Sequence, residues 1–316
     1  MARFFVQRLL TALPILAMVS LITFGLMHLI PGDPAAALGG MSATPEQLAQ
    51  IRHDLGIDRP IWIQLVRYYG GLLHGDLGRS ILLGQGVAAA TLARLPVTLS
   101  LSLYALAITL VLGLAAGIAA ALRHNSILDQ AVMMGAMFGI SVPSFWLALL
   151  MIIFFAVELG WLPTGGYVPF LQDPVGWLRA ATMPAISLAL LQVGLLARIT
   201  RSTMLETLRQ DFVRTARAKG LPNALVVGKH ALANALIPIT TVVGIIITLL
   251  VSGSVVTETI FSVPGIGQLL TSAILNRDYP MVQGGLLIMT ALLVLVNIGI
   301  DFCYALLDPR VRYDER

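Results

Sequence analysis

The sequence predicts an all-α integral membrane protein with six transmembrane helices and a small helical insert outside the membrane after the first of them. Of its 316 residues, 57% are hydrophobic and only 11% are charged. Soluble domains carry roughly 25% charged residues, because their exterior must face water. The hydrophobic residues are also gathered in long uncharged runs, so lipid is the expected solvent for most of the chain.

The first of these runs, residues 9–30, follows Arg3 and Arg8 and contains one titratable group, His28. A cleaved signal peptide is the alternative, since the alanines at 35–37 offer a small-residue cleavage site. The run is longer than the hydrophobic region of about 7–15 residues in a signal peptide. We therefore expect residues 1–30 to be a short tail and a retained first span.

Residues 31–94 form the only long polar stretch between two spans and are predicted to be an extracytoplasmic insert. Thr44, Pro45 and Gln47 have the spacing of a capping box at the start of a short amphipathic helix, which Gly56 would end. A second helix is expected at 62–73. The insert is too short and too loosely patterned for a separate enzyme domain, so we expect a small cap.

The membrane core, residues 95–316, contains the other five expected spans. The shortest, at about 1.5 Å per residue, reaches roughly 27 Å, close to a bilayer core of about 30 Å. It begins near Pro184 and is expected to continue as a helix past Arg198 into water. The five uncharged segments are 95–122, 130–157, 180–197, 231–257 and 279–300.

Small residues and one proline mark the second and third spans. Gly113 with Gly117, and Gly135 with Gly139, each place two glycines on one helix face. Close helix packing and the ordinary glycine enrichment of membrane helices are equally compatible with this spacing. Pro143 breaks the third span, and the freed backbone carbonyl there favours kinked packing over contact with a solute.

Lys and Arg placement predicts the orientation. If the N-terminus is cytoplasmic, most basic residues fall on the cytoplasmic side, and the short outside loops hold only Arg179 and Arg277. Both termini are then cytoplasmic and the insert is outside. The same distribution, without aromatic residues between the basic ones, argues against nucleic acid as a partner.

A polar, basic stretch at 211–238 is the main cytoplasmic element, and it overlaps a cytoplasmic coupling segment expected at 198–233. Asp211 is expected to cap a short helix, Gly220 to stop it in a left-handed conformation, and Pro222 to prevent its continuation. Asn223 is expected to cap a second helix. An anchor lying on lipid headgroups is one interpretation, and a helix that inserts into a groove on a partner is the other.

Several residue types within 211–238 fit a helix that inserts into a groove on a partner. Ala216, Ala218 and Gly220 are small enough for close approach to a partner. Arg214, Arg217 and Lys219 supply positive charge.

The sequence contains no recognisable nucleotide-binding or catalytic motif. Gly228 and Lys229 form the only Gly-Lys pair, and they lack the first glycine and the Ser or Thr of a phosphate loop. Metalloprotease, redox and serine-hydrolase motifs are also missing from the sequence, and Cys303 is the single cysteine. We therefore expect no catalytic residues, no metal site and no cofactor bound by this chain.

Acidic residues bear on two other function classes. Glu158, Glu258 and Asp301 lie near span ends, which argues against an ion-coupled transporter or channel, because such proteins keep ionisable groups within the membrane. A lipid-modifying enzyme would use Asp33, Asp76 or Glu258. Asp33 and Glu258 stand beside turns, where caps and solvated acids are usual.

The sequence resembles the permease subunits of ABC importers of the dipeptide, oligopeptide, nickel and glutathione class. The similarity covers nearly the whole chain and rests on ordered motifs: HLIPGDPA from His28, LGIDRPIW from Leu55, HGDLGRS from His74, ISVPSFW from Ile140, ELGWLPTGG from Glu158, ARITRSTMLETL from Ala197, QDFVRTARAKGL from Gln210, HALANALIP from His230, ETIFSVPGIGQLL from Glu258, NRDYPMVQGG from Asn276 and YALLDPR from Tyr304.

This resemblance implies a type I importer permease fold in a bacterial cytoplasmic (inner) membrane. It implies a homologous second permease, two cytoplasmic ATPase subunits that bind ATP and Mg²⁺, and an extracytoplasmic solute-binding protein as partners. It also implies transport of peptides or similar small solutes, with no enzyme activity in this chain.

The resemblance further implies that 212–220 is the coupling helix, which seats in a cleft of one ATPase. The match departs from the general pattern, because Arg214 stands where the loop usually begins with an acid and Pro238 lies further from Gly220. Within the peptide-type branch, Phe212 replaces a usual Tyr and Val263 a usual Trp. The residues assigned to ATPase coupling are Asp211, Phe212, Arg214, Thr215, Ala216, Arg217, Ala218, Lys219, Gly220 and Leu221.

Polar residues inside the spans are the candidates for the translocation path. They are chosen by polarity alone: Ser141, Ser144, Asn234, Thr257 and Asn297.

Overall fold

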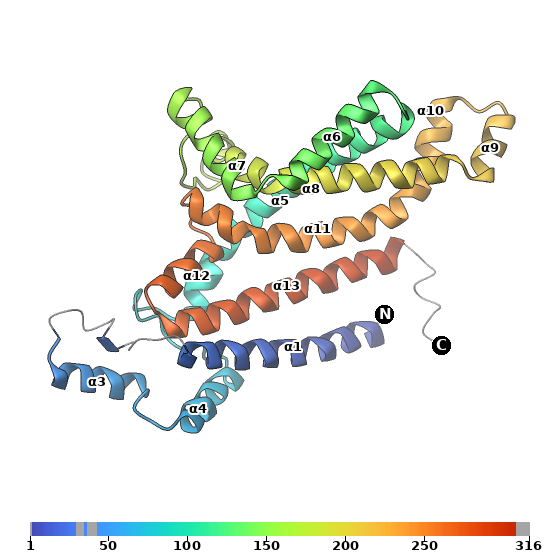
Figure 1. Cartoon of the computed structure of the whole chain (residues 1–316). Helices are drawn as coiled ribbons and strands as arrows, with labels where there is room; N and C mark the ends of the chain where they lie inside the picture. The colour runs from blue at the N-terminus through green and yellow to red at the C-terminus, as the bar shows by residue number, and fades with distance from the viewer. Residues whose placement is uncertain (1, 30–34, 37–42, 308–316) are drawn as a thin grey trace. The chain divides into compact units, whose positions relative to one another are not determined.

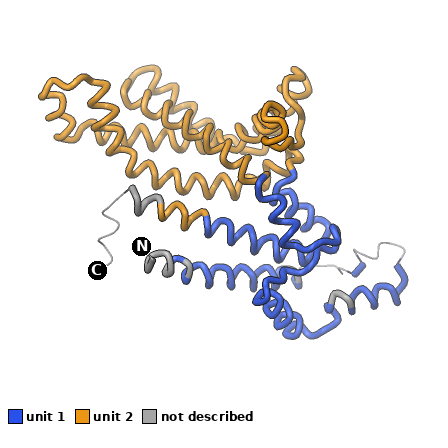
Figure 2. The backbone as a smooth tube through the Cα atoms, turned by 180° about the vertical axis from the view of Figure 1, so that it is seen from behind, with its two compact units in different colours: residues 1–96, 264–295 blue, residues 97–263, 296–316 orange. Residues whose placement is uncertain are grey.

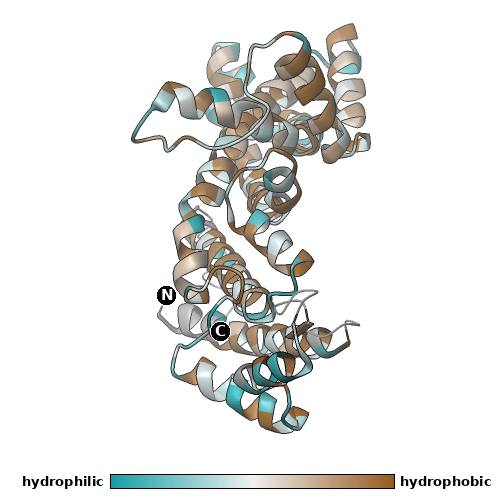
Figure 3. Cartoon of the chain, turned by 90° about the vertical axis from the view of Figure 1, so that its left-hand side faces the viewer, coloured by the Kyte–Doolittle hydropathy of each residue, from teal (hydrophilic) through white to brown (hydrophobic). Residues whose placement is uncertain are grey.

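The computed structural model describes residues 2–29, 35–36 and 43–307, and its elements are helices (Figure 1). Within these residues the only β-type pairing is an isolated bridge between Arg79 and Gly86. The predicted all-α class is confirmed. Hydrophobic residues colour most of the long helices brown in Figure 3, as expected for helices in lipid.

Each predicted span coincides with a helix or a bent helix pair. By length and composition four helical stretches can cross a membrane, and the bent pair adds a fifth. The helix of the first predicted span has a shorter apolar stretch, Leu10–Leu26. In chain order they are α1 (Ala2–Leu29), α5 (Val87–Leu122), α6 (Ile127–Ser141) with α7 (Ser144–Met151) and π-helical η1 (Ile152–Glu158), α8 (Pro174–Leu208), α11 (Ala233–Ile260) and α13 (Tyr279–Leu307).

The predicted break in the third span is a sharp bend. The axes of the two helical halves differ by 98°. Val142 ends α6 in an extended conformation, and Pro143 precedes α7 with φ −62°. Proline has no N–H to donate, so the ladder of helical hydrogen bonds stops at this point.

The chain divides into two compact units, which Figure 2 colours separately. Unit 1 contains residues 1–96 and 264–295, and unit 2 contains residues 97–263 and 296–316.

In unit 2, α8 packs against α6, α7 and α11. Asp173 caps α8 by accepting from the Gly176 backbone N–H at 2.9 Å, so the helix starts earlier than the sequence predicted. Its predicted continuation past Arg198 is confirmed, because the helix runs to Leu208. The buried residues of this core are Leu101, Ala105, Ala121, Ala185, Leu188, Ala189, Leu196, Met204, Ala231, Ala235, Ile239, Ile246 and Leu250.

Glycines on α5 allow α8 to approach closely. A Cβ added at Gly113 would lie 2.9 Å from the Leu196 side chain, and one at Gly117 would lie 2.6 Å from the Ala197 carbonyl oxygen. The packing interpretation is therefore confirmed for this pair. On α6 only Gly139 meets a neighbour, whereas Gly135 has none within 4 Å.

In unit 1, the two helices predicted for the insert are α3 (Pro45–Leu55) and α4 (Ile61–Leu73). The capping box at Thr44 is confirmed, and Gly56 ends α3 with φ 69°. A further helix, α12 (Ile266–Leu275), was not predicted as a separate element. It packs with the start of α5 and of α13 through a small buried cluster of Val87, Ala90, Leu269, Ala273, Met281 and Val282.

Candidate functional site

The candidate site is α9 (Asp211–Ala218), a short helix that follows α8 after only two residues. Val213 is fully buried and Ala216 is 6% exposed. Both pack with Val226, the first residue of the π-helical segment η2 (Val226–Leu232), and with Leu208 and Leu221. This small hydrophobic cluster attaches α9 to the end of α8 and to η2.

The start of α9 differs from the prediction. Gln210 occupies the N-cap position without a side-chain hydrogen bond, and Asp211 is the first helical residue. The expected Asp211 cap is therefore wrong. Its carboxylate is 95% exposed and lies 3.6 Å from the Arg214 guanidinium, which is also exposed. At this exposure such a pair adds little stability.

The end of α9 was predicted correctly. Gly220 has φ 78°, a left-handed conformation in which an L side chain is strained.

The second short helix begins differently from the prediction. Pro222 occupies the N-cap position of α10 (Asn223–Leu225), and Asn223 is its first residue, so the expected Asn223 cap is wrong. From Asn223 to Ile260 the chain is one continuous helical stretch through η2 and α11. η2 is therefore continuous with a helix that is long and apolar enough to cross a membrane.

Eight of the ten predicted coupling residues have exposed side chains or, for Gly220, an exposed backbone. The two that do not are Ala216, which is buried, and Leu221, which is half-buried against the same cluster. The expectation that Ala216 approaches a partner is wrong, because its methyl group faces η2. The exposed residues are Asp211, Phe212, Arg214, Thr215, Arg217, Ala218, Lys219 and Gly220.

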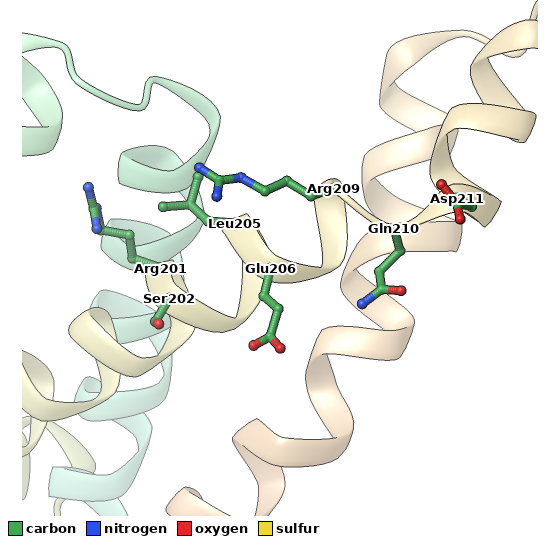
Figure 4. Close-up of a pocket in the computed structure, with 7 residues that line it drawn as sticks. All are labelled: Arg201, Ser202, Leu205, Glu206, Arg209, Gln210 and Asp211. Atoms are coloured by element: carbon green, nitrogen blue, oxygen red, sulfur yellow. The ribbon is translucent and has the colours of Figure 1, made fainter.

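A polar groove of about 520 Å³ lies where α8 ends and α9 begins. Figure 4 shows that the Arg209 side chain extends along α8 while the Glu206 and Gln210 side chains lie on another side. The sequence analysis did not identify this groove, since the two-residue turn that creates it has no Gly or Pro. Its lining residues are Arg201, Ser202, Leu205, Glu206, Arg209, Gln210 and Asp211.

The assignment of the five candidate path residues stays a prediction. No hydrogen bond joins any two of them among the residues that the structure describes. Thr257 is buried at 2% exposure, whereas Ser141 bonds its own helix at Met137 and Asn234 bonds its own helical stretch at His230. Asn297 accepts a hydrogen bond from Thr248 at 2.9 Å.

Glu258 lies in the last turn of α11 and has no exposed surface. The Thr98 hydroxyl on α5 donates to its Oε1 at 2.7 Å. The expectation of a solvated acid at Glu258 is wrong, because its side chain is buried. A capping role for Glu258 stays a prediction. The sequence argues against an ion-coupled transporter because its acidic residues lie near the ends of spans. The burial of Glu258 weakens that argument.

Of the other acidic candidates for a lipid-modifying enzyme, the structure describes only Asp76. Asp76 accepts from the Gly78 backbone N–H at 2.8 Å within a turn, and Asp33 lies outside the described residues. Within the described residues no group of three or more His, Cys, Asp or Glu side chains is placed to hold a metal ion.

Comparison with known families identifies the chain. Residues 113–313 match the family model described as "Binding-protein-dependent transport system inner membrane component". The chain belongs to this family. Residues 1–102 match the associated N-terminal family of the same transport systems. The structure is therefore that of a multi-pass membrane permease.

Relatives of this permease span its whole length. A Brucella abortus protein carried under the name of a peptide transport system permease is 50% identical over 314 residues, covering 99% of this chain and all of the relative. The Di/tripeptide transport system permease protein DppB of Pseudomonas aeruginosa is 43% identical, and the Dipeptide transport system permease protein DppB of Escherichia coli is 36% identical. Each of these two alignments covers 99% of both chains. The chain is the membrane permease component of a peptide-type ABC importer.

A solved structure supports the fold. A chain of the MetNI methionine ABC transporter, determined in inward-facing conformations, superposes with a TM-score of 0.58 at 20% identity. The superposition covers 70% of this permease and 97% of that chain. The type I importer permease fold is confirmed.

Proposed function

We propose that this permease forms one half of the membrane pathway of an ATP-driven peptide importer. Its partners in the proposal are a homologous second permease, two cytoplasmic ATPase subunits and an extracytoplasmic solute-binding protein. The names of its relatives support peptides as the solute class. Family membership supports a division of labour in which other subunits supply energy and selectivity.

The structure of α9 is the observation that carries the energy-coupling part of the proposal. Its outward face is charged and exposed, while Val213 and Ala216 attach its inward face to η2. An ATPase that moves α9 therefore moves η2 and α11 with it, since these form one helical stretch. Buried apolar contacts of this kind are too closely packed to deform continuously, so the displacement is passed on as a rigid movement.

The Gly-Lys pair of the sequence is not placed as it would be in a phosphate-binding loop. Gly228 and Lys229 lie within the helical segment η2 and are exposed there. A phosphate loop instead cradles phosphates with successive backbone N–H groups before a helix begins. In the proposal ATP and Mg²⁺ bind to the partner subunits, and this chain performs no catalysis.

The proposed location is the bacterial cytoplasmic membrane, with both termini and α9 on the cytoplasmic side. The exposed basic residues of α9 and its surroundings support this side, because Lys and Arg accumulate on the cytoplasmic ends of spans. Residues 31–94 then lie on the extracytoplasmic side, where a solute-binding protein would dock.

A matched pair of charge reversals tests the coupling role. Arg217→Glu changes the exposed face of α9, and Lys229→Glu makes the same charge change on η2, where the side chain is also exposed. Arg217→Glu is expected to lose co-purification with the ATPase subunits and ATP-driven peptide uptake in vesicles, whereas Lys229→Glu retains both. Equal behaviour of the two variants would refute α9 as the specific ATPase contact.

The solute is tested separately. The purified importer in vesicles, supplied with its binding protein, is expected to accumulate labelled dipeptides against a gradient when ATP is present. Uptake of other small solutes without any peptide uptake would reject peptides while leaving the coupling result unaffected.

A further inference from the structure

Within unit 1, α4 lies along α1 rather than standing free of it. His28 Nε2 is 3.1 Å from Gln64 Oε1 near the end of α1. One turn earlier on α1, the rings of Phe24 and Tyr68 have centroids 5.6 Å apart. Further along, the Tyr69 hydroxyl is 3.0 Å from the Ser20 hydroxyl.

These contacts show how far along the axis of α1 the helix α4 extends. From His28 to Ser20 the rise along α1 is about 12 Å at about 1.5 Å per residue. Ser20 and Phe24 both belong to the apolar stretch Leu10–Leu26 of α1. The Tyr69 side chain therefore reaches a level that, on a membrane-spanning α1, is within the hydrocarbon of the bilayer.

The face of α4 that carries Trp62, Val66 and Leu73 is apolar and exposed, with Gln64 and Tyr68 on the opposite side and Tyr69 at its edge. Trp62, Val66 and Leu73 follow helical spacing and are 66%, 71% and 87% exposed, and no residue of α4 is fully buried. In water this face would leave a large apolar area solvated, which is unfavourable. The neighbouring surface of α1 is of the same kind, since Leu26 and Leu29 are 47% and 78% exposed.

Two polar side chains of α4, Gln64 and Arg67, are arranged as lipid requires, whereas the Tyr68 hydroxyl is buried without a hydrogen-bond partner among the described residues. Gln64 donates to the Arg59 carbonyl at 2.8 Å as well as meeting His28. The guanidinium of Arg67 extends back toward Gly56, because a Cβ added there would lie 3.3 Å from its Nη1. Gly56 precedes α4, so the charge points away from the part of the helix that lies deepest along α1.

We propose that α4 is an interfacial helix that lies in the membrane leaflet at the extracytoplasmic end of α1 and presents Trp62, Val66 and Leu73 to lipid. Trp62 then lies at headgroup level, where Trp is enriched, and the acyl chains cover Val66 and Leu73. The insert is therefore in part a membrane element, and only the remainder is available to a binding protein. The proposal rests on α1 crossing the membrane and is independent of the transported solute.

Spin labels on single cysteines test whether lipid, water or another protein covers the face of α4 that carries Val66 and Leu73. In a Cys303→Ser background, Val66→Cys and Leu73→Cys carry a nitroxide on α4, and Ala49→Cys carries one on the exposed surface of α3. The complete importer is placed in phosphatidylcholine–phosphatidylglycerol vesicles. Collision rates with oxygen, which partitions into lipid, and with a water-soluble nickel chelate are then measured.

The two α4 labels are expected to collide with oxygen and to be shielded from nickel, while the Ala49 label shows the reverse. Nickel access at Val66 and Leu73 equal to that at Ala49 would place the face in water and overturn the proposal. Shielding from both reagents would place it against a protein subunit and would also overturn it. Two α4 positions are used so that a single poorly folded variant does not decide the result, and no outcome depends on transport activity.

Discussion

Arg201 of α8 holds Asp129 of α6 in a bidentate ion pair. Arg201 Nε lies 2.5 Å from Oδ1 of Asp129, and Nη2 lies 2.7 Å from Oδ2. The Asp129 side chain is 4% exposed and that of Arg201 is 23% exposed. Arg201 also lines the groove beside α9, so this pair fixes the end of α8 from which α9 extends. Parallel N–H···O bonds of this type fix geometry as well as charge.

The first prediction concerns this pair. Asp129→Asn leaves the Arg201 guanidinium without its carboxylate and is expected to destabilise the protein by about 1–3 kcal/mol, since a largely buried charged hydrogen bond is lost. Asp211→Asn is the control, because its carboxylate is almost fully exposed. Thermal unfolding of the detergent-solubilised chain should show a lower Tm for Asp129→Asn only. Equal Tm values would mean that the pair does not stabilise unit 2.

The second prediction uses two glycines with different surroundings. Gly117→Ala places a methyl group against the backbone of α8 at Ala197, which cannot move without shifting the helix, whereas Gly135→Ala fills open space. Overpacking of this kind costs about 1–3 kcal/mol. A reduced yield of folded protein and a lower Tm are expected for Gly117→Ala alone. A neutral Gly117→Ala would show that the two helices are not held at this distance.

The third prediction concerns the end of α9. Nothing lies within 4 Å of a Cβ added at Gly220 or at Gly228, but only Gly220 has a positive φ. Gly220→Ala is therefore expected to cost about 1–2 kcal/mol through backbone strain alone. Amide hydrogen exchange across 211–222 should rise in Gly220→Ala and stay unchanged in Gly228→Ala. Unchanged exchange in both would mean that the left-handed turn does not hold α9 in place.

The sequence allowed correct predictions for several features that follow a local rule. The capping box at Thr44, the left-handed Gly220 and the break at Pro143 each depend on a few neighbouring residues, and all three are confirmed. The long spans are equally readable, because the transfer of an uncharged helix into lipid depends on its own composition.

Other features depend on residues far apart in the sequence. Ala216 is buried because it packs with Val226, and the buried carboxylate of Glu258 accepts a hydrogen bond from Thr98 on α5. The composition of the chain and the spacing of its residues do not indicate that Val226 lies beside Ala216 or that Thr98 lies beside Glu258. The missed N-caps have a different reason: Asp211 and Asn223 have suitable side chains, but the helices begin at these residues rather than after them.

The fourth prediction concerns Asp278 in unit 1, which is 2% exposed. It accepts hydrogen bonds from the Ser80 hydroxyl at 2.5 Å and from the backbone N–H groups of Ile81 and Leu82, both at 3.1 Å. Asp278→Ala removes the acceptor that orders this loop, and each buried donor left without it costs about 1–3 kcal/mol. Limited proteolysis within 78–87 should therefore accelerate.

Asp76→Ala is the control for this experiment, because Asp76 is exposed and accepts only from the Gly78 N–H two residues away. Slow cleavage in both variants would show that the loop is ordered by contacts other than Asp278.

The last prediction concerns the buried carboxylate of Glu258. Thr98→Val keeps the shape of the side chain but removes the hydroxyl that donates at 2.7 Å. Because the carboxylate has no access to water, the lost hydrogen bond is not replaced by solvent, and a cost of about 1–3 kcal/mol is expected. Thr259→Val, one residue after Glu258 and exposed, makes the same chemical change where its hydroxyl bonds its own helix at Val255. A lower Tm for Thr98→Val than for Thr259→Val confirms that α5 stabilises the acid at the end of α11. If the two variants unfold together, the Thr98 hydroxyl does not contribute to the stability of the buried carboxylate.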